Sequence, residues 1–227
     1  MRRRWLPQMA AGIASAVLLA ACGQLAPPAP GPAAEPGAYR AGAAPSVATY
    51  AVDPQASLIA VTVRRAGPLA RLGHDHVVAS HTLAGQVAAG SGSADLSFRL
   101  DQMSVDEPQL LRDAGIEKQP SVQAVEGTRT NMLGAVLDAQ RYPLVTLHAE
   151  RQADGTLNVA ITLHGVTRSL ALPATVRIDA AQVSASGTAR LKQTDFGITP
   201  FSVGGGLLSV QDELEVRYHI VARRPLP

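Results

Sequence analysis

The segment that decides the fold of this chain is Leu208-Ser209-Val210-Gln211-Asp212-Glu213-Leu214-Glu215-Val216-Arg217-Tyr218-His219-Ile220. Apolar side chains occupy every second position, and Asp212 is the lone exception. In an extended strand, side chains two residues apart lie on the same face and adjacent side chains lie on opposite faces. The segment therefore predicts a strand with one dry face and one wet face.

Residues 95–101, 157–164 and 170–179 alternate in the same way. Turn-forming residues separate such runs: Asp53-Pro54, Gly90-Ser91-Gly92-Ser93, Ala153-Asp154-Gly155 and Gly204-Gly205-Gly206. From about 106 to 142 the apolar residues recur instead at helical spacing. The pattern predicts an all-β fold with a short helical insertion, built as a single antiparallel β-barrel of about eight strands. Closure is favoured because it removes exposed strand edges.

The N-terminus is typical of a secretion signal. Three arginines, at positions 2–4, precede an uncharged apolar run from Met9 to Ala21. As a helix this run would extend roughly 20 Å, which is short of a ~30 Å hydrocarbon core. Leu19-Ala20-Ala21-Cys22 resembles the lipobox of bacterial lipoproteins, and Cys22 is the only cysteine. We expect a signal peptide over 1–21 and lipid attachment at Cys22.

The same pattern predicts the organisation of the remaining chain. Residues 22–45 are rich in Pro, Ala and Gly and predict a tether, and residues 46–227 predict the folded domain. We expect the protein to lie in the cell envelope, lipid-anchored to the outer membrane and facing the periplasm.

Charge and motifs exclude other classes. The formal charge of +2 includes the three signal arginines, so removing them leaves −1 and no basic footprint for nucleic acid. The chain has no Gly-x-Ser-x-Gly elbow, no His-Glu-x-x-His and no Gly-rich phosphate loop. We therefore expect neither an enzyme nor a resident cofactor.

Aromatic residues make up only 4% of the chain, and the single Trp is Trp5 in the signal. A barrel lined by Leu, Val, Ile and Ala can keep a dry cavity that accepts a hydrocarbon ligand. Aliphatic side chains can equally fill a core at the usual packing density. Composition leaves both interpretations open.

Five short landmarks from about Tyr50 to Ala222 resemble the YceI-like family. They are Tyr50-x-x-Asp53-x-x-x-Ser57, Leu83-Ala84-Gly85-Gln86-Val87, Leu137 to Leu147 with its Tyr142-Pro143, Leu163-His164-Gly165-Val166-Thr167-Arg168, and Gln193-Thr194-Asp195-Phe196-Gly197-Ile198. The resemblance implies an extended lipocalin-like barrel that holds a polyisoprenoid lipid such as a quinone, with the head group near the helical insertion. Side chains expected to line it are Phe98, Leu100, Met132, Leu147, Ile161, Leu163 and Phe196.

The chain also departs from the family pattern. Where many relatives carry Arg-Asp-x-His-Leu, it has Arg129-Thr130-Asn131-Met132-Leu133, so no role is carried over to the missing Asp and His.

Three of the six histidines lie within residues 74–81. On a regular strand His74 and His76 would point the same way, and His81 the opposite way. The pair can bond to backbone or water at the barrel mouth, can contact a lipid head group, or can bind a transition metal with a third ligand from elsewhere. His148 and His164 fall on polar faces, where we expect them to be solvated. The alternative to a lipid-binding protein is thus a metal-binding or redox-accessory protein that uses His74 and His76.

Overall fold

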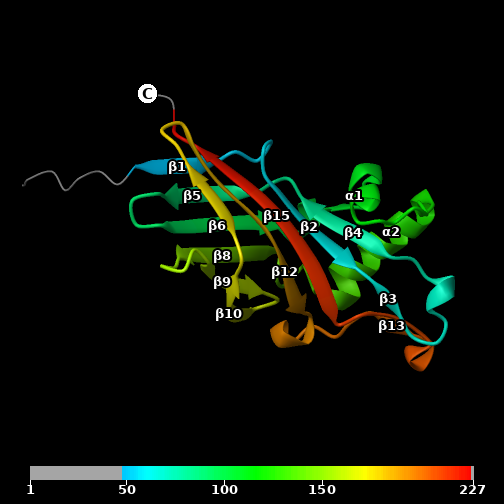
Figure 1. Ribbon diagram of the computed structural model, residues 1–227. Coiled ribbons are helices and arrows are strands. Elements are labelled where there is room, and N and C mark those ends of the chain that lie inside the picture. Colours follow the sequence, from blue (N-terminus) through cyan, green and yellow to red (C-terminus); the bar gives the residue numbers. More distant parts are fainter. Residues whose placement is uncertain (1–47, 226–227) are drawn as a thin grey trace, which may run out of the picture. The chain divides into compact units, whose positions relative to one another are not determined.

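The computed structural model describes residues 48–225, which fold around an antiparallel sheet (Figure 1). In chain order the strands are β1 (Thr49–Val52), β2 (Leu58–Val63), β3 (Arg65–Ala66), β4 (His76–Ser80), β5 (Ala84–Ala88), β6 (Ser93–Arg99), β7 (Ser104–Val105), β8 (Leu144–Arg151), β9 (Leu157–Leu163), β10 (Val166–Leu172), β11 (Thr175–Ile178), β12 (Gln182–Lys192), β13 (Ser202–Val203), β14 (Leu208–Val210) and β15 (Glu213–Arg223). The helices are α1 (Pro108–Asp113) and α2 (Val122–Asn131), the latter followed by a π-helical turn, η3 (Met132–Val136). Short 3₁₀ turns are η1 (Ala70–Leu72), η2 (Leu100–Gln102), η4 (Thr194–Phe196) and η5 (Gly204–Gly206).

The long strand β15 organises the main sheet. One of its edges pairs with β2 and then with β1, and its other edge pairs with β12 along the whole of Gln182–Lys192. From β1 the sheet continues through β5, β6, β8 and β9 to β10. From β2 it continues through β4 to β7. All pairings are antiparallel, so the predicted all-β class is confirmed. The described residues form fifteen strands rather than about eight, because several are only two to four residues long.

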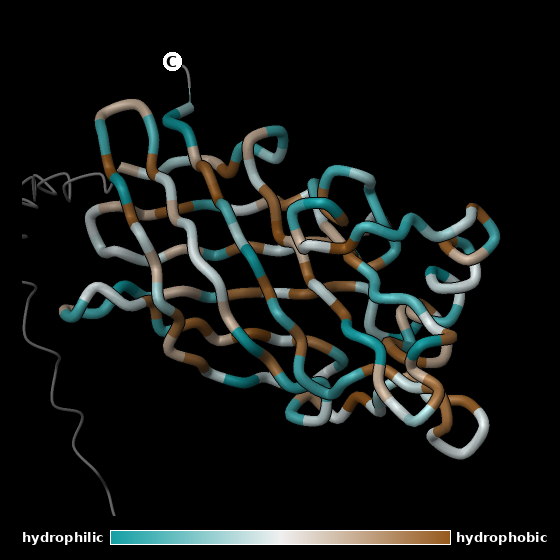
Figure 2. Tube along the Cα trace, turned by 45° about the vertical axis from the view of Figure 1, so that its right-hand side comes forward, coloured by the Kyte–Doolittle hydropathy of each residue, from teal (hydrophilic) through white to brown (hydrophobic). Residues whose placement is uncertain are grey.

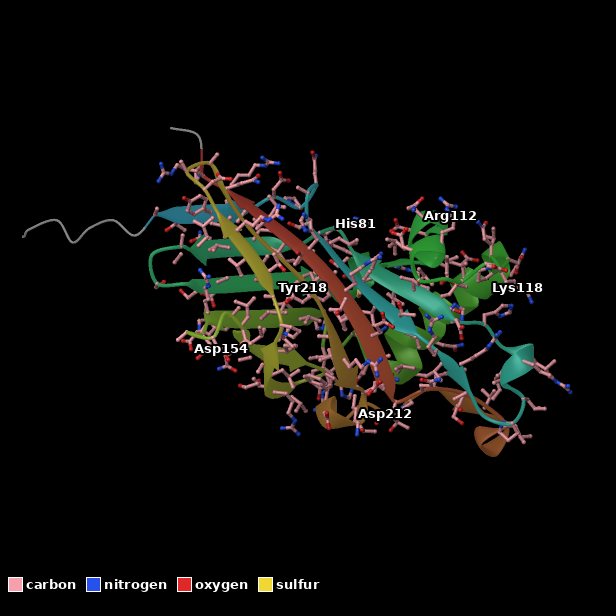
Figure 3. All side chains as sticks on the ribbon, in the orientation of Figure 1. His81, Arg112, Lys118, Asp154, Asp212 and Tyr218 are labelled. Atoms are coloured by element: carbon pink, nitrogen blue, oxygen red, sulfur yellow. The ribbon has the colours of Figure 1, made fainter. Side chains whose placement is uncertain are left out.

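The segment at 208–220 is two strands rather than one. Asp212 separates β14 from β15, and its carboxylate accepts hydrogen bonds from the backbone N–H of Thr194 at 2.9 Å and from the Thr194 hydroxyl at 2.7 Å. Figure 3 shows Asp212 at the start of β15 and Tyr218 further along it. The position that broke the alternation therefore anchors the turn that follows β12.

The sheet curls toward a barrel but does not close by backbone pairing. Within residues 48–225 no ladder joins β10 to β12, so the expected closure is incomplete. Pro173, which directly follows β10, has no backbone N–H to offer a neighbouring strand. The Tyr218 hydroxyl donates to the Pro173 carbonyl at 2.7 Å, and Arg168 Nε donates to the Asp195 carbonyl at 2.7 Å. Side chains therefore bridge this seam between β10 and β12.

The helical insertion predicted for about 106–142 is confirmed. Helix α1 begins with Pro108 at its first position, where the missing N–H costs nothing. Its Leu110 and Leu111 are buried against Val77 and Ala79 of β4, on the outside of the barrel wall. Helix α2 and the π-helical turn cover one end of the barrel (Figure 1).

A second, three-stranded sheet is formed by β3, β14 and β13. The predicted signal peptide, Cys22 and the tether lie outside the described residues. Between residues 48 and 225, no helix combines the length and the apolar character needed to cross a membrane.

Candidate functional site

The curled sheet and the helical insertion line a partly open cavity of about 350 Å³. Its wall is mainly aliphatic and comes from many of the strands, including Val61, Val78, Leu96, Val145, Val159, Ala189, Leu191, Val216 and Ile220. Figure 2 shows hydrophilic and hydrophobic residues alternating along these strands. The cavity exists because one row of each strand points inward and too few large rings are present to fill it. Of the two interpretations that composition left open, the hollow barrel is the one observed.

Strand register brings the predicted lining residues together. Leu147 of β8 lies opposite Leu96 of β6 on one side and Ile161 of β9 on the other. Directly opposed side chains on one face of a sheet lie about 5 Å apart and form a continuous row. Seven of the nine side chains predicted for the ligand site line this cavity: His76, Phe98, Leu100, Met132, Leu147, Ile161 and Leu163.

The other two predicted residues lie elsewhere. Phe196 is only 1% exposed and packs in the hydrophobic core, in the η4 turn that Gly197 ends with φ of 71°. His74 precedes strand β4 and does not line the cavity. Since β4 starts at His76, His74 and His76 do not belong to the same strand, and the prediction that they share a strand face is wrong.

The residues predicted to line the cavity include none from β15, which forms another part of its wall. Leu214, Val216, Tyr218 and Ile220 of β15 were assigned to one face, and that face lines the cavity. Alternation was thus the signal that could have found them. Thr128 and Asn131 of α2 also line the cavity, but nothing in their sequence context indicated this.

One end of the cavity, which we call the polar end, is marked by His76, Thr128 and Asn131. His76 Nδ1 lies 2.7 Å from Oδ2 of Asp106, whose side chain is completely buried. The other carboxylate oxygen accepts the Val77 N–H at 2.9 Å, and the Asp106 N–H donates to the Val77 carbonyl at 2.8 Å. Asp106 adopts a positive φ of 57° to make these contacts. The carboxylate therefore holds one imidazole nitrogen and fixes the orientation of the ring.

The second nitrogen of His76 makes one long contact. Nε2 lies 3.4 Å from the Thr128 hydroxyl, a long contact, on the side where both residues line the cavity. An imidazole whose Nδ1 is bound to a carboxylate presents Nε2 as a hydrogen-bonding group of defined direction. The polar end can thus recognise one oxygen-bearing head group while the aliphatic side chains contact hydrocarbon. Ser93, Arg151 and Gln193 are further polar residues of the cavity lining.

The metal alternative gains no further ligand from the structure. The His74 and His76 rings have centroids 6.2 Å apart, tilted by 53°. Residues 48–225 contain no cluster of three or more His, Cys, Asp or Glu side chains arranged to hold a metal ion. Burial lowers the pKa of His74, with the positive charge of Lys118 acting in the same direction.

The remaining histidines make separate contacts. His81 lies 2.9 Å from Glu107, and His148 lies 2.7 Å from Asp95 on the outer face of the sheet. His164 has φ of 53° in the β9–β10 turn and packs on Tyr142 with ring centroids 4.7 Å apart.

The fold and the cavity define a class: an antiparallel β-protein with a mainly apolar cavity. The sequence matches the YceI-like domain family over residues 50–222, and the chain belongs to that family. No curated protein matches the sequence.

Two solved structures share the fold. A polyisoprenoid-binding domain from Saccharophagus degradans, implicated in plant cell wall breakdown, aligns with a TM-score of 0.56 at 13% identity and covers 79% of this chain and 99% of its own. BcnA of Burkholderia cenocepacia aligns with a TM-score of 0.54 at 18% identity, and the alignment covers 75% of this chain and 99% of the BcnA chain.

Proposed function

We propose that this protein holds an amphiphilic polyisoprenoid lipid, of the quinone type, with the tail in the cavity and the head group at the polar end. The observation that carries the proposal is the aliphatic cavity of about 350 Å³ ending at His76. Ligand pockets typically measure roughly 300–1,000 Å³, so this cavity suits one tail. The similarity to a polyisoprenoid-binding domain supports the same ligand class.

The cavity also favours binding over catalysis. At its polar end a positioned imidazole lies beside a hydroxyl and an amide, with aliphatic side chains beyond them. Groups of this kind orient a ligand, and we propose that the protein acts as a binding protein rather than an enzyme.

We further propose that the protein is lipid-anchored at Cys22 in the outer membrane and faces the periplasm. The support is the arginine cluster, the apolar run and the Leu19-Ala20-Ala21-Cys22 sequence. Labelling cells with radioactive palmitate tests the anchor: the wild-type chain becomes labelled and Cys22→Ser does not. Equal labelling of both would contradict the anchor.

The test of the ligand is organic extraction of gently purified protein followed by mass spectrometry. We expect an isoprenoid lipid in wild-type protein, and about tenfold less in Ala149→Trp, because Ala149 lines the cavity and an indole there occupies the space of the tail.

Ala160→Trp is the matched control. Ala160 lies on the neighbouring strand opposite His148, on the outer face, and should keep the lipid. Wild-type protein that neither yields a lipid nor binds added quinone would refute the proposed function.

A further inference from the structure

Two loops at one end of the molecule form a single lobe, which we call the loop lobe: residues 64–75 and 200–211. Strand β14 pairs with β3 from the first loop and with β13 from its own. The Leu69 N–H donates to the Leu207 carbonyl at 2.8 Å, and the Gln211 N–H donates to the Arg64 carbonyl at 2.7 Å. Figure 1 shows β3 and β13 in the same region, at the end away from the start of β1, and β14 lies between them in the sheet.

Gly67 makes this contact close. A Cβ at Gly67 would lie 2.6 Å from the Gly206 carbonyl oxygen and 2.7 Å from that of Leu207, and its φ is 88°. Only glycine accommodates both the conformation and the approach. The two loops are therefore packed backbone to backbone and present their side chains as one surface.

That surface is unusually apolar for a loop region. Leu72, Val203 and Leu207 are 64%, 45% and 49% exposed. They are half of the six large hydrophobic side chains that are exposed in the described part of the chain. Exposed aliphatic residues gathered in adjoining loops mark an interaction site more often than scattered ones do.

The loop lobe adjoins residues that line the cavity. Val63, Phe201 and Val210 line the cavity wall, and they stand beside or within the strands of the loop lobe. The exposed aliphatic side chains of these loops are thus only a few residues from the cavity lining. A partner on the lobe would lie next to one end of the cavity.

The charge of the loop lobe restricts the partner. Residues 64–75 carry three arginines against one aspartate, Asp75, while residues 200–211 carry no charged side chain. Asp75 pairs with Arg64 and Arg65, at 3.3 Å and 3.7 Å. Arg71 is exposed and has no ion pair among residues 48–225. The lobe is therefore basic, whereas the rest of the described chain is net acidic.

We propose that the loop lobe docks on an anionic phospholipid bilayer, with Leu72, Val203 and Leu207 in the headgroup and acyl boundary and Arg71 at the phosphates. Aliphatic side chains beside a basic group are the combination that binds such surfaces. This docking role rests on the proposed lipid-binding function. Docking here opens the cavity toward the membrane, so that a lipid passes between the bilayer and the cavity without crossing water.

The test places a reporter tryptophan in the full chain. Trp5→Phe removes the only native tryptophan, and Leu207→Trp or Leu144→Trp then supplies one probe. Leu144 is 46% exposed on β8, outside the loop lobe, and so matches Leu207 in size and exposure. Because both proteins keep the N-terminal region, any anchoring there affects them equally.

With vesicles of phosphatidylcholine and phosphatidylglycerol at a ratio of about 3:1, the Leu207→Trp emission should shift to the blue and be quenched by lipids brominated near the headgroup. The Leu144→Trp emission should stay unchanged. Adding Arg71→Glu, or using neutral vesicles, should reduce the Leu207→Trp quenching several-fold, since basic groups are attracted to an anionic surface.

Equal quenching at both positions, or none at either, would overturn the docking proposal. A blue shift at Leu207→Trp that grows with protein concentration without vesicles would also overturn it, because it would show contact between copies of the chain. Quinone titration of the same variants separates the two proposals: binding without quenching leaves the ligand proposal standing, and quenching without binding leaves the docking surface standing.

Discussion

At the scale of residues, the opening landmark of the family resemblance serves the structure rather than the ligand. The Tyr50 hydroxyl donates to the Asp179 carbonyl at 3.2 Å, and Asp53 accepts from Arg223 at 2.6 Å. The Ser57 hydroxyl donates to the Val221 carbonyl at 3.2 Å and accepts the Val221 N–H at 2.9 Å. Asp53 and Ser57 tie the start of the domain to its last strand, and Tyr50 ties it to the turn between β11 and β12, so the landmark identifies the fold without marking the site.

His76→Asn should weaken binding of a quinone while leaving binding of a head-group-free isoprenoid hydrocarbon unchanged, because the Asn amide N–H can replace Nδ1 beside the buried Asp106 carboxylate. The substitution removes Nε2 at the polar end, and one hydrogen bond there is worth about 1–3 kcal/mol, or roughly 5- to 150-fold in Kd. Fluorescence titration with the two ligands measures this. Equal losses for both ligands would mean that the ring contributes only to packing.

His148 and Asp95 predict a pH effect on the outer face. The hydrogen bond to Asp95 raises the pKa of His148 above its ordinary value. The pair therefore stabilises the fold below pH about 6.5, where unfolded histidine is already charged, and this contribution is lost as pH rises through the raised pKa.

Replacing Asp95 should therefore return the titration of His148 toward the ordinary range. In Asp95→Asn, the deficit in Tm relative to wild type should be larger at pH 5.5 than at pH 8.5, and small because both groups are exposed. Proton NMR of the His148 ring follows the titration. An unchanged midpoint in the variant would contradict this assignment.

At the scale of elements, the seam between β10 and β12 is where the structure departs from a closed barrel. Gly187 on β12 faces it: a Cβ there would lie 2.4 Å from the Pro173 carbonyl oxygen and 2.6 Å from the Tyr218 hydroxyl. The hydrogen bond between those two groups occupies the space that any other side chain would need. The contacts across the seam therefore require glycine at position 187.

Gly187→Ala should destabilise the protein by about 1–3 kcal/mol, because the methyl group must displace backbone or break the Tyr218 to Pro173 hydrogen bond. Urea unfolding gives the free energy. Gly127→Ala is the comparison: Gly127 lies in α2 with nothing within 4 Å of the added Cβ, and alanine there should stabilise by up to about 1 kcal/mol. If both substitutions acted alike, the seam would not be the cause.

At the scale of the whole molecule, the cavity makes stability depend on its contents. A wall that lines empty space loses the contacts a filled core would make. A ligand that binds only the folded chain restores them and stabilises it through mass action. The cavity is therefore the feature through which the proposed ligand would stabilise the fold.

Protein stripped of lipid should regain stability when quinone is added, by about 2.7 kcal/mol at a ligand concentration 100 times the Kd. Thermal unfolding with increasing quinone measures the rise in Tm. Ala149→Trp should show little rise, since the indole occupies the cavity. A rise as large in this variant as in wild type would place the ligand outside the barrel.

The sequence by itself determined the faces of the strands, the helical insertion and part of the aliphatic lining, because alternation with period two is a local property of extended backbone. It placed Phe98, Leu147 and Ile161 correctly on the cavity wall. It misplaced Phe196, because the landmark around Phe196 does not indicate on which side of the wall the side chain lies. It did not find Asp106, which meets His76 from 30 positions away.

Only the tertiary structure decided whether the barrel closes, whether it is hollow and which loops meet. Closure depends on whether β10 and β12, which are distant in sequence, come within hydrogen-bonding reach. Hollowness depends on the summed volume of side chains from all walls, and the loop lobe depends on Gly67 meeting Leu207. These properties depend on contacts between residues that are distant in sequence, and no local sequence pattern specifies them.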